Sequence, residues 1–455
     1  MKPGTLKKPF VVLFSGFIVL MLSVSPSFSF SLPPVERETL DNGLRIVVSE
    51  DHSLPFVTFQ VIVDGGSRLD PPLREGLSYL TAKGLLHGTS RYTARQLSYR
   101  LDFLGANLSA TSSEDYLSVS LRALKKDFLE GWNFLMDAVI HPAFPEDEFR
   151  LEKLRTLGAI KAEDETPGTL SRRTFAKALF AATPYGHPVM GTEDSLGRLT
   201  RTDLVTYHDA YIRPNNAILV VVGDITLKEI KQHLLDRLES WPAGGILPVF
   251  SGQKPSPGIK LVTAERGTTQ ANLVLGNVVP PRNNPDYFPM VVMNYILGGG
   301  SFSSRLFAEI RAKRGFAYSV NSGFDFKKYA GSFAVTLQTK NASAREAVTV
   351  ILEEMRKIQR EPVTDRELEG AVKYLTGSFP LRLDTQAKLA GFLAQVEFYQ
   401  LGADYGDTYA SRVRAVTKDD IQRAAVAHLR PDNYVLAVVG NLKEGGFSDD
   451  SPFPQ

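Results

Sequence analysis

The most informative absence in this 455-residue chain is cysteine, of which there is none. Without cysteine there can be no disulfide, no thiolate metal ligand, no thiol protease and no lipid anchor on a cysteine. A surplus of charge is missing too, because 52 Lys and Arg nearly balance 50 Asp and Glu. No basic excess points to nucleic acid, so we expect no such partner. Composition leaves other partners open.

The chain also lacks a complete hydrolase motif. It has seven histidines, but no two stand four residues apart, and none pairs with a glutamate at a recognised metal-ligand spacing. No Gly-x-Ser-x-Gly sequence is present, which removes the usual nucleophile elbow of serine hydrolases. Any catalytic role must therefore rest on residues outside these signatures.

Long apolar runs are scarce, and the run at Phe10–Val24 predicts export. Three lysines among the first eight residues precede it, and the small-x-small triplet Ser27-Phe28-Ser29 follows it. This arrangement is typical of a cleavable signal peptide, here residues 1–29. Export without disulfides fits a bacterial periplasm. The alternative is an uncleaved membrane anchor, although the run is shorter than the roughly 20 residues of a membrane-spanning helix.

The remaining chain divides into two similar halves. It is too long for one hydrophobic core, which stops growing at about 250–300 residues. Residues 213–224 resemble residues 430–441 at an offset of 430 − 213 = 217, and the preceding helices match at the same offset. A Pro- and Gly-rich stretch at 241–257 predicts a linker between them. We therefore predict domains at 35–240 and 258–445.

Periodicity predicts some of the elements within these domains. The first domain should contain a helix over about 73–86 and strand residues over 108–124. In the second domain, residues 303–311 have the pattern of an amphipathic helix. These three segments matter because each holds candidate functional residues.

The first motif occupies residues 65–89 and reads Gly65-Gly66-Ser67-Arg68, then Gly76, then Gly88-Thr89. It resembles the first catalytic region of the pitrilysin/insulinase metallopeptidases, the inverzincins. Active members carry His-x-x-Glu-His there, so that two histidines bind zinc and the glutamate polarises water. The matching positions in this chain are Tyr79, Ala82 and Lys83. Neither zinc ligand nor base remains among them.

A third ligand in active members is a glutamate on a later helix. The matching stretch is Leu157-Gly158-Ala159-Ile160-Lys161, so Ala159 stands at the ligand position. Nearby Glu163 and Glu165 are expected to face solvent. A catalytic zinc usually needs three protein ligands, so we expect no metal on this chain.

The second motif, residues 294–320, is similar to the second signature of the same family. It includes Gly298-Gly299-Gly300 and, further on, Arg311 and Tyr318. The resemblance implies that Arg311 and Tyr318 hold substrate at the zinc of the other half of an assembled enzyme. Either side chain can donate to the negative charge that develops on a peptide carbonyl. Gly299 and Gly300 are predicted to line the same substrate site.

One further segment, residues 105–112, resembles the family's substrate-facing edge strand. Such a strand can bind a peptide by adding it to the sheet. The resemblance thus predicts substrate contacts at Leu108, Ser109, Ala110 and Thr111.

Together these observations predict an α+β fold of two homologous domains, each a mostly antiparallel sheet packed with helices. The predicted function is that of a non-catalytic subunit, with no cofactor of its own, whose partners are a homologous zinc-bearing subunit and a peptide substrate. One alternative is a self-sufficient metallopeptidase with atypical ligands. The other is a peptide-binding scaffold without a protease partner.

Overall fold

The computed structural model describes residues 32–181, 183–250 and 258–447. The predicted signal peptide, and residues 251–257 of the predicted linker, lie outside these ranges. Within them, no helix combines the length and the apolar character needed to cross a membrane.

The first half of the chain forms a six-stranded sheet with the order β1-β2-β6-β3-β5-β4. Its pairs are antiparallel except β2 with β6, which run parallel. Its strands are β1 (Val35–Thr39), β2 (Arg45–Glu50), β3 (Phe56–Asp64), β4 (Asn107–Ser112), β5 (Tyr116–Leu124) and β6 (Ala217–Gly223).

The second half forms a five-stranded sheet with the order β7-β11-β8-β10-β9. Again the pairs are antiparallel except one, β7 with β11. Its strands are β7 (Lys260–Glu265), β8 (Gln270–Val279), β9 (Ala317–Phe326), β10 (Gly331–Lys340) and β11 (Val435–Gly440). This order repeats β2-β6-β3-β5-β4 strand for strand. The predicted α+β fold of two homologous sheets is therefore confirmed, while the exact domain boundaries stay a prediction.

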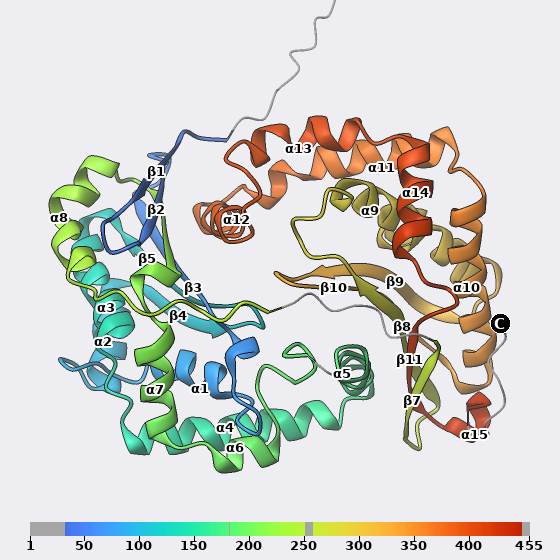
Figure 1. Cartoon of the computed structure of the whole chain (residues 1–455), viewed down its shortest axis with the longest axis horizontal. Coiled ribbons are helices and arrows are strands. Elements are labelled where there is room, and N and C mark those ends of the chain that lie inside the picture. Colours follow the sequence, from blue (N-terminus) through green and yellow to red (C-terminus); the bar gives the residue numbers. More distant parts are fainter. Residues whose placement is uncertain (1–31, 182, 251–257, 448–455) are drawn as a thin grey trace, which may run out of the picture. The chain divides into compact units, whose positions relative to one another are not determined.

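Helices surround both sheets (Figure 1). Those of the first half are α1 (Leu77–Gly84), α2 (Ala94–Leu104), α3 (Phe128–Ile140), α4 (Glu146–Asp164), α5 (Pro167–Leu179), α6 (Glu193–Arg198), α7 (Arg201–Tyr211) and α8 (Leu227–Glu239). Those of the second are α9 (Tyr287–Asn294), α10 (Ala344–Arg360), α11 (Asp365–Ser378), α12 (Gln386–Phe398), α13 (Tyr405–Arg414), α14 (Lys418–His428) and α15 (Leu442–Gly445).

The repeat found in the sequence corresponds to one helix and the strand that follows it. α7 and α14 both begin after a threonine that forms a capping box, Thr200 with Asp203 and Thr417 with Asp420. Each helix leads into a central strand, β6 or β11, whose residues are all buried. A strand buried on both faces needs apolar residues throughout, and this explains why these two segments remain similar.

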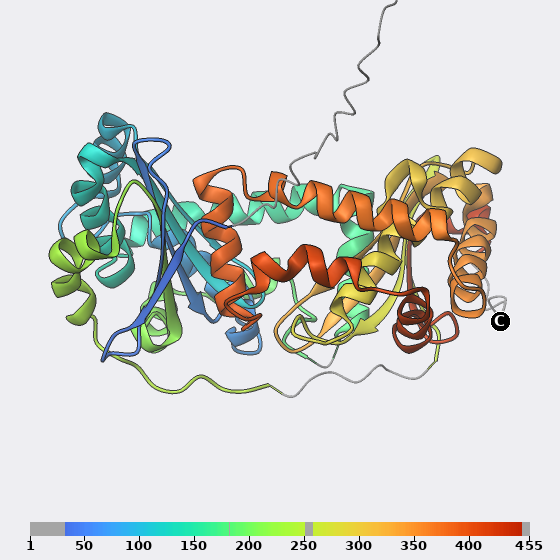
Figure 2. The ribbon, with the colours of Figure 1, turned by 90° about the horizontal axis from the view of Figure 1, so that it is seen from above.

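The two halves exchange one helix each, which the sequence did not predict. On one face of the first sheet, Val47, Ile62 and Val220 pack against Leu389 and Leu393 of α12, a helix of the second half. Figures 1 and 2 both show the red-orange α12 beside the strands of the first sheet. Successive side chains of a strand point to opposite faces of the sheet. The other face of the first sheet is therefore available to the helices of the first half.

The second sheet receives α5 in return. Phe175 and Leu179 of α5 pack against Val274 and Val278 of β8, and against Ala437 of β11. Each half therefore covers its own sheet on one face and the other half's sheet on the other.

Candidate functional site

The helix that resembles the zinc-binding helix is α1, and a buried carboxylate fixes its first turn. Asp70 accepts hydrogen bonds from the backbone N–H groups of Gly76 and Ser78, both at 2.8 Å. Gly76 has φ 95°, a left-handed conformation that favours glycine. Burial raises the pKa of Asp70 to about 8, against the lowering effect of these hydrogen bonds. The helix is thus well defined even though its zinc motif is missing.

The three matching positions on α1 do not fit a zinc ion. Ala82 is fully buried in the core, and the ammonium of Lys83 lies 5.4 Å from the ring centre of Tyr79. Burial, together with the charges of Glu152 and Glu163, raises the pKa of Tyr79, so its phenol keeps its proton. A protonated phenol and an ammonium group both disfavour a divalent cation at this place.

The later helix supplies no replacement ligand. Ala159 is exposed on α4 and has no donor atom. Glu152 on the same helix is paired with His87 and Arg155, each at 3.7 Å. In the parts of the chain that the structure describes, no three His, Asp or Glu residues are grouped so that they could hold a metal. The donor set therefore does not fit the family's zinc.

The predicted edge strand, β4, does lie at an edge of its sheet. Among the described residues its strand partner is β5, which leaves the other side of its backbone unpaired. Ser109 and Thr111 are exposed, whereas Ala110 is buried. The Ser112 hydroxyl donates to Ser78 of α1 at 3.2 Å, so this edge adjoins α1. Peptide binding at residues 108–111 stays a prediction.

The second signature begins with three glycines in close contact with their surroundings. A Cβ on Gly299 would lie 2.4 Å from the side-chain Nδ2 of Asn294, and one on Gly300 would lie 2.5 Å from the backbone carbonyl oxygen of Tyr295. Glycine is thus required here by packing, whatever its contact with substrate. The sequence predicted an amphipathic helix over 303–311. The structure instead has a π-helix over Phe307–Lys313, which starts later and has more residues per turn than an α-helix.

The structure brings Arg311 and Tyr318 together. The guanidinium carbon of Arg311 lies 4.6 Å from the ring centre of Tyr318, and 4.9 and 5.7 Å from those of Phe307 and Phe302. Phe302 and Tyr318 are 74% and 83% exposed. Within the described residues, Arg311 has no ion pair and no side-chain hydrogen bond, so its N–H donors remain available. The rings of Phe302, Phe307 and Tyr318 thus lie around a cation that has no counter-ion among the described residues, and the phenol of Tyr318 is exposed beside it.

No hydrogen bond, ion pair or ring contact among the described residues joins this group to Tyr79, Lys83 or Ala159. The chain therefore presents two separate groups. One lies on α1 and α4, and the other is formed by the π-helical segment Phe307–Lys313 and the start of β9. Each resembles half of a peptidase site.

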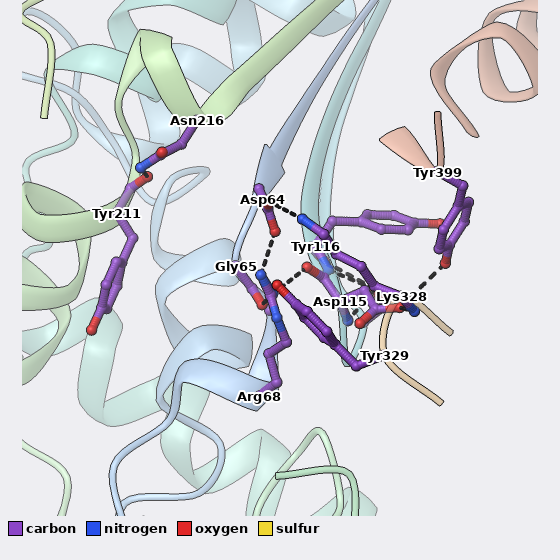
Figure 3. Close-up of polar contacts among 12 residues, drawn as sticks. Asp64, Gly65, Arg68, Asp115, Tyr116, Tyr211, Asn216, Lys328, Tyr329 and Tyr399 are labelled. Carbon is purple, nitrogen blue, oxygen red and sulfur yellow. Dashed lines mark hydrogen bonds and ion pairs between the residues drawn. The ribbon is translucent and has the colours of Figure 1, made fainter. Parts of the chain in front are cut away.

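Sequence reasoning missed a third group, which connects the two halves (Figure 3). Asp115, in the β4–β5 turn, accepts from the Lys328 backbone at 2.7 Å, the Tyr185 hydroxyl at 2.5 Å and the Tyr399 hydroxyl at 3.3 Å. Burial raises the pKa of Asp115, while the hydrogen bonds from Tyr185 and the Lys328 backbone oppose the shift. Lys328 belongs to the β9–β10 turn, so the equivalent turns of the two sheets contact each other.

Further charges complete this connection. The Lys328 ammonium and the Arg68 guanidinium both bind Asp64, and Arg68 also donates to the Asp115 carbonyl at 2.7 Å. Lys327 binds Glu114 at 2.8 Å. Burial alone would lower the pKa of Lys327, but Glu114 and Asp325 outweigh it and raise the pKa. These residues come from distant parts of the sequence, and no local spacing marks them.

Comparison with known proteins now identifies the family. The family profile described as "Insulinase (Peptidase family M16)" matches residues 45–193, and the profile described as "Peptidase M16 inactive domain" matches residues 198–375. The chain belongs to the insulinase (M16) peptidase family. The resemblance stated from the two motifs is thereby confirmed.

Two relatives match nearly all of this M16 chain. An uncharacterized zinc protease of Streptomyces coelicolor is 28% identical over 420 residues, which cover 90% of both chains. A Helicobacter pylori protein named "Non-peptidase homolog YmxG" is 26% identical over 403 residues, covering 88% of this chain and 92% of the relative. The relatives thus include one named as a zinc protease and one named as a non-peptidase homolog. Their names do not tell which of the two this chain resembles in activity.

Solved structures agree with the M16 fold. A Pseudomonas fluorescens structure described as a peptidase M16 inactive domain has a TM-score of 0.85 at 25% identity and covers 89% of this chain and 98% of its own. A Helicobacter pylori protease has a TM-score of 0.83 at 20% identity and shares the fold.

Proposed function

We propose that this M16 chain is the non-catalytic subunit of a periplasmic peptidase complex in which a homologous partner carries the zinc. The observation that carries the proposal is the state of the second signature. Arg311 has free donors, and Tyr318 presents its hydroxyl to solvent beside it. A guanidinium group without a counter-ion, held in place by aromatic rings, can bind an anion. It can equally bind a carbonyl oxygen on which negative charge develops during the reaction.

The first half supports the same proposal because it lacks the residues that would bind zinc. In place of ligands and base it has Tyr79, Ala82, Lys83 and Ala159, and the side chain of Lys83 adds a positive charge. A chain with these residues needs zinc and a general base from elsewhere to hydrolyse a peptide bond.

The chemistry then divides between two subunits. A zinc ion held by the partner would supply the water activation that this chain lacks. Hydrolysis of a peptide bond places negative charge on the carbonyl oxygen. Arg311 and Tyr318 donate to that oxygen or to a neighbouring carbonyl, which lowers the barrier and holds the peptide in place. The exposed edge of β4 offers a second, weaker place for peptide, since backbone pairing does not depend on sequence.

Two alternatives predict different observations. A self-sufficient metallopeptidase needs three ligands, which the described residues do not group together. A peptide-binding scaffold needs the β4 edge but no partner, and it would leave Arg311 without a catalytic role.

The test is co-purification of the tagged chain from the periplasmic fraction of its native host. We expect a stoichiometric partner whose sequence contains an intact His-x-x-Glu-His motif, and chelator-sensitive peptidase activity in the complex. Recovery of the chain alone, with peptide bound but no partner, would instead favour the scaffold. Gel filtration of the recovered material distinguishes a specific complex from incidental association.

A further inference from the structure

A pocket of about 320 Å³ lies in the second half, among α9, α12, α13 and the short turn Pro380–Arg382. It shares no residue with the Arg311 group or with α1. Its volume is at the lower end of small-molecule sites, about 300–1,000 Å³, and suits one ring with a short substituent. Its occupant is therefore a small molecule or a single terminal side chain.

The inner wall of the pocket is aromatic. Tyr405 and Tyr409 are buried, and Tyr409 stacks on Phe379 with ring centres 4.0 Å apart. Tyr287 and Phe392 contribute further rings to the lining. Burial raises the pKa of both Tyr405 and Tyr409, so both hydroxyls remain protonated and can donate. Such a wall favours a flat aromatic ligand.

The charge of the lining has one sign. It includes Arg282, Arg382 and Lys388, and no Asp or Glu. Lys388 is paired with Asp384 at 2.6 Å, outside the lining. Neither arginine forms an ion pair with any residue that the structure describes. Two guanidinium groups without counter-ions, beside a protein pocket, leave a site for an anion.

The position of Arg282 shows that this charge is built into the pocket. Its guanidinium carbon lies 3.5 Å from the ring centre of Tyr287, and its Nη2 donates to the Tyr405 hydroxyl at 2.7 Å. The ring and the hydroxyl fix the plane of the guanidinium, and an arginine so fixed loses little entropy when it binds a carboxylate. Arg382 is exposed, and its place is at the rim of the pocket.

We propose that this pocket binds a small aromatic carboxylate, with the ring against Tyr405, Tyr409 and Phe392 and the carboxylate between Arg282 and Arg382. The proposal goes beyond the subunit function, because neither the partner nor Arg311 takes part. A free aryl acid and the C-terminal aromatic residue of a peptide offer the same chemistry.

Titration calorimetry on the full chain, supported by ligand-observed NMR, tests the proposal with four probes. These are 3-phenylpropionate, its amide, the tripeptide Ala-Ala-Phe and its C-terminal amide. We expect saturable binding of at least one acid with a stoichiometry of one, and at least about tenfold weaker binding of its amide. Binding of the propionate alone identifies a free acid as ligand, whereas binding of the tripeptide identifies a peptide terminus.

Variants locate the site. Arg382→Gln should weaken binding of the acid by about tenfold or more, since one charged hydrogen-bonding partner is lost. Arg366→Gln is the matched control, because Arg366 is exposed on the neighbouring α11 and does not line the pocket; it should leave affinity within about twofold. Arg282→Gln gives a second measurement inside the pocket, with folding checked by thermal unfolding. Absence of binding by both acids, equal binding of acid and amide, or unchanged affinity in both pocket variants would overturn the proposal.

Discussion

The two halves share one strand order, yet their equivalent regions have opposite character. In the first half, the α1 positions that match the family's zinc motif hold a buried methyl group, a half-buried phenol and an ammonium that lies over that phenol. In the second half, Tyr318 is exposed and Arg311 is half-buried among aromatic rings, and neither has a charged partner among the described residues. A chain that had lost all function would have no reason to leave an uncompensated arginine ringed by aromatic side chains. The difference supports the proposal that the second half supplies the residues that act on substrate.

The exchange of helices makes the two halves depend on each other for packing. Because α12 covers the first sheet and α5 covers the second, neither sheet is fully covered by its own half. Tyr185 and Tyr399, which follow these two helices, both donate to Asp115. The second half thus depends on the first for its core, even though the first has no zinc site.

Loss of the Tyr318 hydroxyl should have the largest effect. In a complex with the zinc-bearing partner, Tyr318→Phe should lower turnover by about 10²–10³, which is typical for removal of one donor to a developing oxyanion. The ring and its contact with Arg311 remain, so assembly should be unchanged. Initial rates of peptide hydrolysis and gel filtration measure the two properties.

Tyr99→Phe is the control, since Tyr99 is an exposed tyrosine on α2 of the first half. If Tyr318→Phe retains wild-type turnover, Tyr318 is only a strand residue and the comparison between the halves fails.

The helix exchange predicts a large loss of stability at one residue of α12. Leu393 is 1% exposed and packs on the first sheet. Leu393→Ala should reduce the free energy of unfolding by about 2–5 kcal/mol. Leu381→Ala, at a leucine that is 66% exposed, should change it by less than about 0.5 kcal/mol. Urea unfolding followed by circular dichroism gives both values, and similar losses for the two variants would argue against the exchange.

A smaller effect is expected at the ion pair that anchors the second signature. Arg305 binds both oxygens of Glu367, at 2.6 and 2.9 Å. Burial tends to raise the pKa of Glu367, but the hydrogen bonds of Arg305 and Thr364 outweigh it and lower the pKa from 4.5 to about 2. Because the folded-state pKa lies below the unfolded one, this stabilisation is present above about pH 4.5 and declines as the pH falls toward 2.

Glu367→Gln should therefore cost about 1–2 kcal/mol at pH 7, a figure reduced for the partial exposure of the pair. The difference from wild type should shrink as the pH is lowered toward 3. Glu369→Gln, at an exposed residue of the same helix, is the control. A difference that stays constant between pH 7 and pH 3 would show that Glu367 does not titrate as argued.

The smallest change is expected from restoring the zinc motif. The triple variant Tyr79→His, Ala82→Glu, Lys83→His should not produce an efficient peptidase. Ala159 still supplies no third ligand, and the new glutamate replaces a methyl group that is fully buried. Rates of peptide hydrolysis with added zinc should stay near those of the wild-type chain. Strong hydrolysis would place the third ligand elsewhere in the first half.

The sequence predicted those features that depend on local pattern. The repeat at 213–224 and 430–441 revealed both central strands, because burial on two faces restricts each of their residues. The prediction of strand structure over 108–124 was correct, but the segment forms two strands, because the chain turns at Ser113–Asp115 between β4 and β5. Local periodicity could not show that this turn contacts Lys328.

Contacts between residues far apart in the sequence could not be predicted either, because local periodicity carries no information about them. The exchange of α5 and α12 depends on which sheet a helix packs against, and an amphipathic pattern specifies a face but no partner. Arg311 and Tyr318 were paired by their resemblance to a family motif. The rings of Phe302 and Phe307 around Arg311 came only from the structure.

The most direct test is to measure zinc and peptidase activity on the purified chain by itself. Elemental analysis after gel filtration in zinc-containing buffer should find well below one zinc per chain, and a library of fluorogenic peptides should remain uncleaved. Activity should appear only when the zinc-bearing partner is added. One tightly bound zinc per isolated chain, with chelator-sensitive hydrolysis, would contradict the account and make the chain a metallopeptidase in its own right.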